Sequence, residues 1–354
     1  MNRPRLFCEF PAGLAAVSLR LQGGTHCRPP ISRCGNKAGF SQTILGVLGL
    51  HSGQGAAAYW WAEADPDVAA LLRIYPDPDA LREVARIIRG WAGEEPRALW
   101  ERLRAERRAR GAAAGTAEWC VLRAWSVKSD ESFYRGPNNT SGGVHDRGAL
   151  TISGLADRAD RLAEVAGWVV AGEWAFRQGA PESGFNPTTA LGSVWASDSG
   201  RDGFRPPTTC EKMADRLASS AISAPVRVSP RIPSAAEVSA AIGTPGDLSG
   251  CVVYMDPPYA GTTGYTADLS RAEVVAHALD FASLGATVAI SEAEAIPDLV
   301  RSGWYSVEIT GGRVGAKRTF SKQQREIITM NRPAEYVVPV QISIYRTPAH
   351  QELT

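Results

Sequence analysis

A buried strand that ends in a stiff acidic turn constrains this chain more than any other feature. The apolar run of residues 251–255 has the length and the valine content of a strand inside an α/β sheet. Asp256, Pro257, Pro258 and Tyr259 follow that run directly. Open α/β sheets bind their ligands at the carboxyl ends of their strands, so we expect a site at this turn.

The residue types in this turn suit recognition of a flat base that carries an amino group. Two prolines fix φ and remove N–H donors, so the turn is stiff and its carbonyl oxygens point outward. The Asp256 carboxylate and the Pro257 carbonyl form a pair of acceptors beside the ring of Tyr259. We therefore interpret Asp256, Pro257, Pro258 and Tyr259 as the candidate catalytic residues, in preference to a plain proline-rich turn.

Length and composition limit the class of protein. At 354 residues, the chain has room for two domains or for one large domain with an insertion. No apolar run reaches the roughly 20 residues of a membrane span, and the N-terminal residues make a poor signal peptide. We expect a cytoplasmic protein without a membrane partner. The six cysteines include no Cys-x-x-Cys pair, which favours reduced thiols and no metal site.

Hydrophobic patterning predicts regular elements in two separate parts of the chain. In the first part we expect helices at 40–50, 66–74, 79–91 and 96–110 and a strand at 59–63, with short strands and turns over 5–35. In the second part we expect strands at 251–255, 286–291, 305–309 and 326–330 and helices at 271–284 and 296–301. Asp65 before Pro66 has the pattern of a helix N-cap.

The middle of the chain, which is rich in Gly, Ser, Thr, Asn and Pro, separates these two parts. The simplest architecture is an α/β sheet with helices on both faces, interrupted by a loop-rich insertion. We predict an N-terminal half at 1–110, an insertion at 111–240, a second half at 241–335 and a tail at 336–354. Net charge is only +1, so a nucleic-acid surface would have to come from local clusters of basic residues.

A strand ending in Asp-Pro-Pro-Tyr late in such a chain resembles the Dam-type DNA adenine-N6 methyltransferases. Residues 32–37 resemble the segment of that family that touches the methionine end of S-adenosylmethionine (SAM). Residues 61–67 resemble its acidic segment after a strand, and 326–331 its final strand. The resemblance covers about 30–90 and 248–332, and it is thin across 111–235.

This resemblance implies a Rossmann-like SAM-dependent methyltransferase sheet in which the insertion recognises the target. The family's cofactor loop, Phe-x-Gly-x-Gly before a helix, has its nearest counterpart in residues 51–56, which lack the Phe and the helix. Glu63 would bind the SAM ribose. The cofactor-binding residues implied are Gly35, Asn36, Lys37, Gly53, Gly55, Glu63, Asp65 and Asp256.

Double-stranded DNA is the partner implied, bound by a monomer or a weak dimer. Arg, Lys and Asn suit contacts to phosphates and base edges, although solvated loop residues are the plainer interpretation of each. The candidates are Lys128, Arg135, Asn138 and Asn139 in one loop, Arg201 and Arg205 in another, and Arg313, Lys317 and Arg318 in a basic segment without acids.

The mechanism implied is direct transfer to an adenine that has been flipped out of the duplex and stacked on Tyr259. Asp256 and the Pro257 carbonyl would accept hydrogen bonds from the N6 amino group. Cytosine-N4 methylation uses the same chemistry, and the aspartate favours adenine mildly. Protein-glutamine methylation, RNA as the substrate, and a non-catalytic DNA-binding protein with a decayed SAM site are further alternatives.

Overall fold

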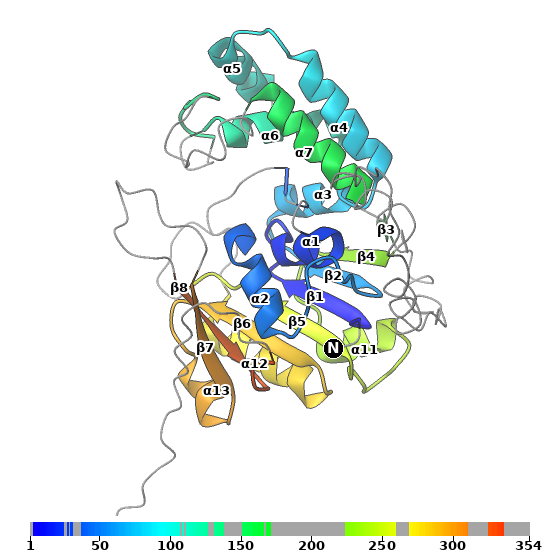
Figure 1. Cartoon of the computed structure of the whole chain (residues 1–354), viewed down its shortest axis with the longest axis vertical. Coiled ribbons are helices and arrows are strands. Elements are labelled where there is room, and N and C mark those ends of the chain that lie inside the picture. Colours follow the sequence, from blue (N-terminus) through cyan, green and yellow to red (C-terminus); the bar gives the residue numbers. More distant parts are fainter. Residues whose placement is uncertain are drawn as a thin grey trace, which may run out of the picture.

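The computed structural model describes residues 3–24, 27, 29–30, 37–106, 108–109, 111–126, 131–137, 151–165, 168–170, 224–259, 269–310 and 325–335. These residues form an α/β fold around one mixed sheet of eight strands (Figure 1). The strands are β1 (Leu6–Phe10), β2 (Tyr59–Ala62), β3 (Trp168–Val170), β4 (Ala224–Ser229), β5 (Cys251–Met255), β6 (Thr287–Glu292), β7 (Tyr305–Thr310) and β8 (Arg325–Met330). The helices are α1 (Ala16–Gly23), the short 3-10 turn η2 (Lys37–Gly39), α2 (Ser41–Val47), α3 (Pro66–Ile74), α4 (Pro78–Gly90), α5 (Pro96–Glu106), α6 (Ala113–Ala124), α7 (Ile152–Val165), α11 (Ala235–Ala241), α12 (Arg271–Ser283) and α13 (Pro297–Arg301).

The strand order is β3-β4-β2-β1-β5-β6-β8-β7, and β8 is the one strand of this sheet that runs against the others. From β1 the chain moves outward to β2 and β4, and then returns to place β5 on the other side of β1. This reversal makes the β1–β5 boundary a topological switch point, which is where open α/β sheets bind ligands.

Alternation along the central strands buries both faces of the sheet. On β1, Leu6, Cys8 and Phe10 pack in a cluster with α11, α12 and α13, whereas Phe7 belongs to a cluster with α1, α2 and α3. Figure 1 shows these two sets of helices on opposite sides of the sheet. None of the helices in the described part of the chain has the length and apolar character needed to span a bilayer.

Helices α4, α5, α6 and α7 form a further layer beyond α3 (Figure 1). Three tryptophans, Trp100, Trp119 and Trp125, are buried in this layer, which continues the core beneath it. The Trp100 indole N–H donates to the Leu122 carbonyl at 3.3 Å, so α5 is tied to α6. The layer therefore shares the apolar core beneath it and adds hydrogen bonds of its own.

Most of the predicted elements are confirmed, and two regions differ. Residues 5–35 do not consist only of short strands and turns, because they contain β1 and helix α1. The span 111–240 is not simply a loop-rich insertion either. It contains α6 and α7, and its last part supplies β4 to the sheet and α11 to the helices that cover it. Helix α1 was missed because it is buried on nearly every side and has no amphipathic period.

Candidate active site at the carboxyl edge of the sheet

The Asp-Pro-Pro-Tyr turn lies at the carboxyl end of β5, as the sequence predicted, and this end of β5 stands at the switch point. Phe10 and Met255 are partners in the register of β1 and β5, and the Asp256 N–H donates to the Phe10 carbonyl at 3.0 Å. Pro257 is buried, and Pro258 and Tyr259 are half-buried. The turn is therefore held against the end of β1 while its side chains stay partly accessible.

Lys37, at the start of the turn before α2, reaches this site across the sheet edge. Its Nζ lies 2.9 Å from Asp256 Oδ1 and 3.5 Å from Glu326 Oε1, and its side chain is only 6% exposed. The same ammonium lies over the ring of Tyr259, 4.8 Å from the ring centroid. The fold thus brings together Lys37, Asp256 and Tyr259, three of the residues that the resemblance implied.

Glu326 is a site residue that sequence reasoning missed. It is the second residue of β8, and because that strand is reversed, its beginning lies at the edge where β5 and β6 end. The Tyr259 hydroxyl donates to Glu326 Oε2, while the other oxygen of Glu326 faces Lys37. The one signal in the sequence was a carboxylate at the start of a strand, and its position depends on a strand direction that the sequence leaves open.

Burial and charge set the protonation of this cluster. Burial raises the pKa of Asp256 to about 6, and the neighbouring Lys37 limits the rise. Burial acts to lower the pKa of Lys37, but Asp256 and Glu326 outweigh it, so that pKa is raised. Burial, with Asp256 and Glu326 beside it, raises the pKa of the Tyr259 phenol. Near neutral pH the site therefore holds an ammonium, an aspartate that is mostly ionised and a neutral phenol.

The loop after β1 lies beside this cluster and is held by the buried side chain of Glu9. Its two carboxylate oxygens accept from the N–H groups of Val17 at 3.3 Å and Ser18 at 2.8 Å, in the first turn of α1. Ala15, the N-cap residue of that helix, has a left-handed φ of 50° and no side-chain cap, so Glu9 supplies the acceptors that a cap would normally give. Burial raises the pKa of Glu9 to about 7.

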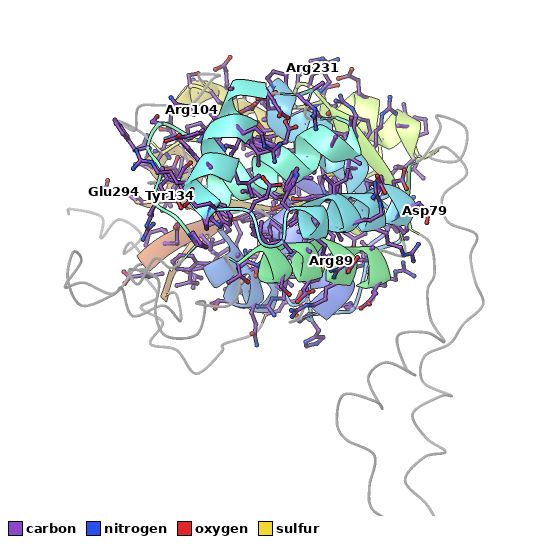
Figure 2. The ribbon with its side chains drawn as sticks, turned by 90° about the horizontal axis from the view of Figure 1, so that it is seen from above. Asp79, Arg89, Arg104, Tyr134, Arg231 and Glu294 are labelled. Carbon is purple, nitrogen blue, oxygen red and sulfur yellow. The ribbon has the colours of Figure 1, made fainter. Side chains whose placement is uncertain are left out.

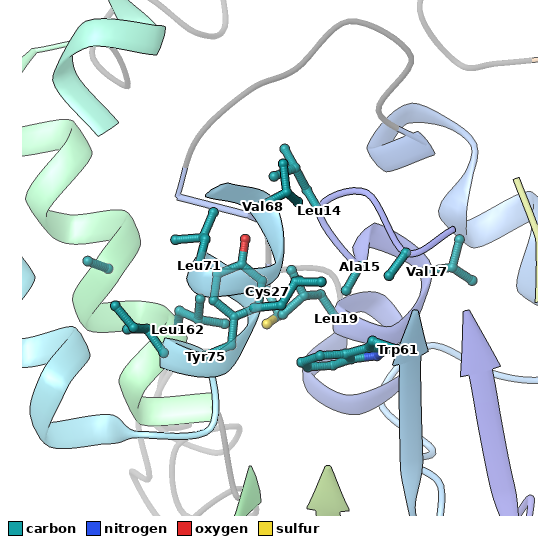
Figure 3. Close-up of a cluster of buried hydrophobic side chains, with 14 of the residues drawn as sticks. Leu14, Ala15, Val17, Leu19, Cys27, Trp61, Val68, Leu71, Tyr75 and Leu162 are labelled. Carbon is teal, nitrogen blue, oxygen red and sulfur yellow. The ribbon is translucent and has the colours of Figure 1, made fainter. Parts of the chain in front are cut away.

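Glu63 connects the same loop to the end of β2. Its Oε2 accepts from the Gly13 N–H at 2.8 Å, and its Oε1 from the Asp65 N–H at 2.9 Å. Gly13 has a φ of +50°, and a methyl group added there would meet no atom within 4 Å. The loop backbone is thus open at Gly13. Figure 3 shows Leu14 beside Val68 of α3, on the packed side of the loop.

The expected cofactor glycines lie elsewhere, which corrects the prediction from sequence. Gly53 and Gly55 precede β2, and their N–H groups donate to the carbonyls of Arg20 at 3.1 Å and Leu21 at 2.9 Å, near the end of α1. That position is the amino end of the strands, opposite Asp256. Both have positive φ and form an ordinary turn, which is the common meaning of a short Gly-x-Gly.

The other predicted residues fall into two groups. Asp65 caps α3, accepting from the N–H groups of Asp67 and Val68, which confirms the predicted N-cap. Arg135 is exposed in the segment that follows α6, and its backbone N–H donates to the Trp125 carbonyl at 2.6 Å. Gly35, Asn36, Lys128, Asn138, Asn139, Arg201, Arg205, Arg313, Lys317 and Arg318 lie outside the described residues.

No protein-family model matches this chain, and no curated protein is significantly similar to it in sequence.

Proposed function

We propose that the protein is a SAM-dependent methyltransferase that acts on the exocyclic N6 amino group of adenine in double-stranded DNA. The observation that carries this proposal is the grouping of Asp256, Lys37 and Tyr259 at the switch point of the sheet. A rigid acceptor, a cation and a flat ring in one half-buried place suit a planar base with an amino group beside an anionic cofactor tail.

The residues around the loop after β1 fit the chemical groups of SAM. Glu63 has carboxylate oxygens suited to ribose hydroxyls, Lys37 has a cation suited to the amino-acid carboxylate, and the backbone at Gly13 is open to close approach. When bound, SAM supplies a methyl group on a sulfonium centre. We therefore propose residues 10–15 as the cofactor loop, and the hydrogen bonds from Glu9 to the start of α1 support this assignment.

In the proposed reaction, groups of the protein orient the amino nitrogen and accept the hydrogen bonds that it donates. The ionised Asp256 accepts a hydrogen bond from the amino group, and the Pro257 carbonyl accepts the second. These bonds draw the nitrogen lone pair out of conjugation with the ring, while Tyr259 stacks on the base and fixes its plane. Positioning and preorganised polarity then provide most of the rate effect, without a covalent intermediate on the protein.

Access to a base in duplex DNA requires that it leave the helical stack. The helical layer formed by α4, α5, α6 and α7 is the part of the fold that we propose contacts the duplex. Figure 2 shows Arg104 and Tyr134 of this layer on the same side of the molecule as Glu294, which follows β6 at the carboxyl edge. Arg135 is adjacent to Tyr134 and exposed, which suits contact with a phosphate.

Two alternatives are separated by specific observations. Cytosine-N4 transfer would use the same groups, and Asp256 at the first motif position favours adenine. A binding protein with a decayed cofactor site drew its support from the irregular loop at Gly53 and Gly55. Those residues lie at the amino ends of the strands, opposite Asp256, and the cofactor loop proposed at residues 10–15 does not depend on them.

Nucleoside analysis tests the proposal. Purified protein and SAM would be incubated with unmethylated bacterial DNA, and the DNA would then be digested and analysed by mass spectrometry. We expect N6-methyl-2′-deoxyadenosine. N4-methyl-2′-deoxycytidine would assign the reaction to the other base. If the digest contains no methylated nucleoside and the protein also fails to bind SAM, the proposal is wrong and the DNA-binding alternative replaces it.

A further inference from the structure

We propose that Glu326 is a positioning residue for this transfer. Its carboxylate holds the Lys37 ammonium when Asp256 binds the amino group of the base, and it also fixes the ring of Tyr259. The inference rests on the proposed function, since it assigns a task to a residue beside the proposed acceptor. It comes from the way Glu326 divides its two oxygens between two neighbours.

Each oxygen of Glu326 has a different partner. Oε1 lies 3.5 Å from Lys37 Nζ, and Oε2 accepts from the Tyr259 hydroxyl. The side chain of Glu326 is only 10% exposed, so these contacts are largely shielded from water. The carboxylate thus links the cation and the ring that flank Asp256.

The position of Lys37 creates the need for a second carboxylate. Its ammonium lies 2.9 Å from Asp256 Oδ1, one of the two oxygens with which Asp256 would accept from an incoming amino group. A buried ammonium that gives up one carboxylate is disfavoured unless another stays beside it, because water does not replace the lost ion pair. Glu326 already lies 3.5 Å from the Lys37 ammonium, so it retains the ammonium when the contact with Asp256 is given up, and a lysine on a flexible stem can shift toward it.

The bond to Tyr259 gives Glu326 a second effect on the same site. A stacking ring is useful only if its plane is fixed, and the hydroxyl contact with Glu326 restrains its rotation. Glu326 itself lies on β8, which pairs with β6 on one side and with β7 on the other. Its neighbour Ile327 is the register partner of Glu292 on β6. The ring is thus anchored to the sheet rather than to the turn alone.

Other charged and titratable groups around Asp256 remain in place when Glu326 is changed. They are Glu9 on β1, Tyr254 on β5, Glu292 on β6 with its partner Arg271, and Lys37 and Tyr259 within the cluster. Both Glu9 and Glu292 interact with Asp256 at a distance and are unchanged in Glu326→Gln, so a difference in the acidic limb between that variant and the wild type reports the loss of the Glu326 charge beside Asp256.

Glu326→Gln tests the proposal, since it keeps an oxygen for the Tyr259 hydroxyl and removes the charge that would hold Lys37. We expect kcat/KM for unmethylated duplex DNA to fall by roughly 10- to 100-fold, because Lys37 stays on Asp256. The acidic limb of the kcat/KM profile should move to lower pH, since a neighbouring negative charge has gone. Glu335→Gln changes an exposed carboxylate that follows the other end of β8; it is the matched control and should stay within about twofold of the wild type.

Two further variants keep the test decisive. Glu326→Asp retains the charge and should keep the acidic limb of the wild type even where stability drops. Tyr259→Phe removes only the hydroxyl and should lower kcat/KM without moving that limb. Wild-type kcat/KM and an unmoved limb in Glu326→Gln would overturn this proposal alone. Absence of transfer by the wild-type protein would overturn the proposed function and this inference together.

Discussion

The ammonium of Lys37 lies 2.9 Å from the carboxylate of Asp256, although the two residues come from opposite halves of the sheet. Lys37 precedes α2 in the crossover between β1 and β2, and Asp256 ends β5 on the other side of β1. The switch in strand order between β1 and β5 brings them together. This pair defines the centre of the site, and most of the expected outcomes depend on it.

The activity of the protein should depend on pH through Asp256. Burial raises its pKa to about 6, and the proposed mechanism needs the ionised carboxylate as the acceptor for the amino group. We therefore expect kcat/KM for DNA to rise as pH increases through about 6 and then to level off. A profile that stays flat from pH 5 to 8 would contradict a role for this carboxylate.

Glu9 should make the stability of the fold depend on pH in a defined direction. Its pKa rises from 4.5 to about 7 on folding, so the folded state binds more protons than the unfolded state between those values. The free energy of unfolding should therefore fall as pH rises from about 4.5 to 7. In Glu9→Gln this part of the dependence should disappear, which chemical denaturation at several pH values would reveal. An identical pH dependence in the two proteins would rule out the buried, titrating Glu9.

The cofactor loop can be located by a matched pair of glycine substitutions. Gly13 and Gly53 both have positive φ, so alanine strains the backbone at each by about 1–2 kcal/mol. Only Gly13 lies in the proposed cofactor loop, with open space where the methyl would point. We expect Gly13→Ala to weaken SAM binding about tenfold or more in calorimetry, and Gly53→Ala to leave it nearly unchanged. The reverse ranking would return the cofactor loop to the segment before β2.

A DNA contact by the helical layer should be visible in the salt dependence of binding. Arg135 is exposed beside Tyr134, and Arg135→Ala should weaken binding to duplex DNA about three- to tenfold and reduce the salt slope by about 1. Arg301, which is also exposed but pairs with Asp298 on α13, outside the helical layer, is the control and should change neither quantity. Equal effects of the two substitutions would argue against a specific contact at Arg135.

Local patterns were sufficient for part of the fold and of the site. Asp65 followed by Pro66 carries its own N-cap and helix start, and the predicted helix coincides with α3. The turn that begins at Asp256 was also predictable, since an apolar run and the following prolines define it without any distant contact. Lys37 was reached only through the resemblance, because no local pattern connects it to Asp256.

The remaining site residues depend on packing that no local pattern carries. Helix α1 is buried on almost all sides, so its sequence lacks the alternation of apolar and polar residues that marks a surface helix. The loop before it, with Glu9 and Gly13, was therefore not recognised from the sequence. Glu326 belongs to the site only because β8 runs against its neighbours. The pair Gly53 and Gly55 was assigned to the wrong edge, since a Gly-x-Gly turn has the same appearance at either end of a strand.

The most direct test of the central claim is transfer of tritiated methyl from SAM to unmethylated duplex DNA by the wild-type protein and by two aspartate variants. Asp256→Asn removes the charge at the proposed acceptor, whereas Asp247→Asn changes an exposed aspartate at the amino end of the same strand. We expect label in DNA from the wild type and from Asp247→Asn, and a loss of at least about a thousandfold in Asp256→Asn with SAM affinity retained. Wild-type incorporation by Asp256→Asn would contradict the account.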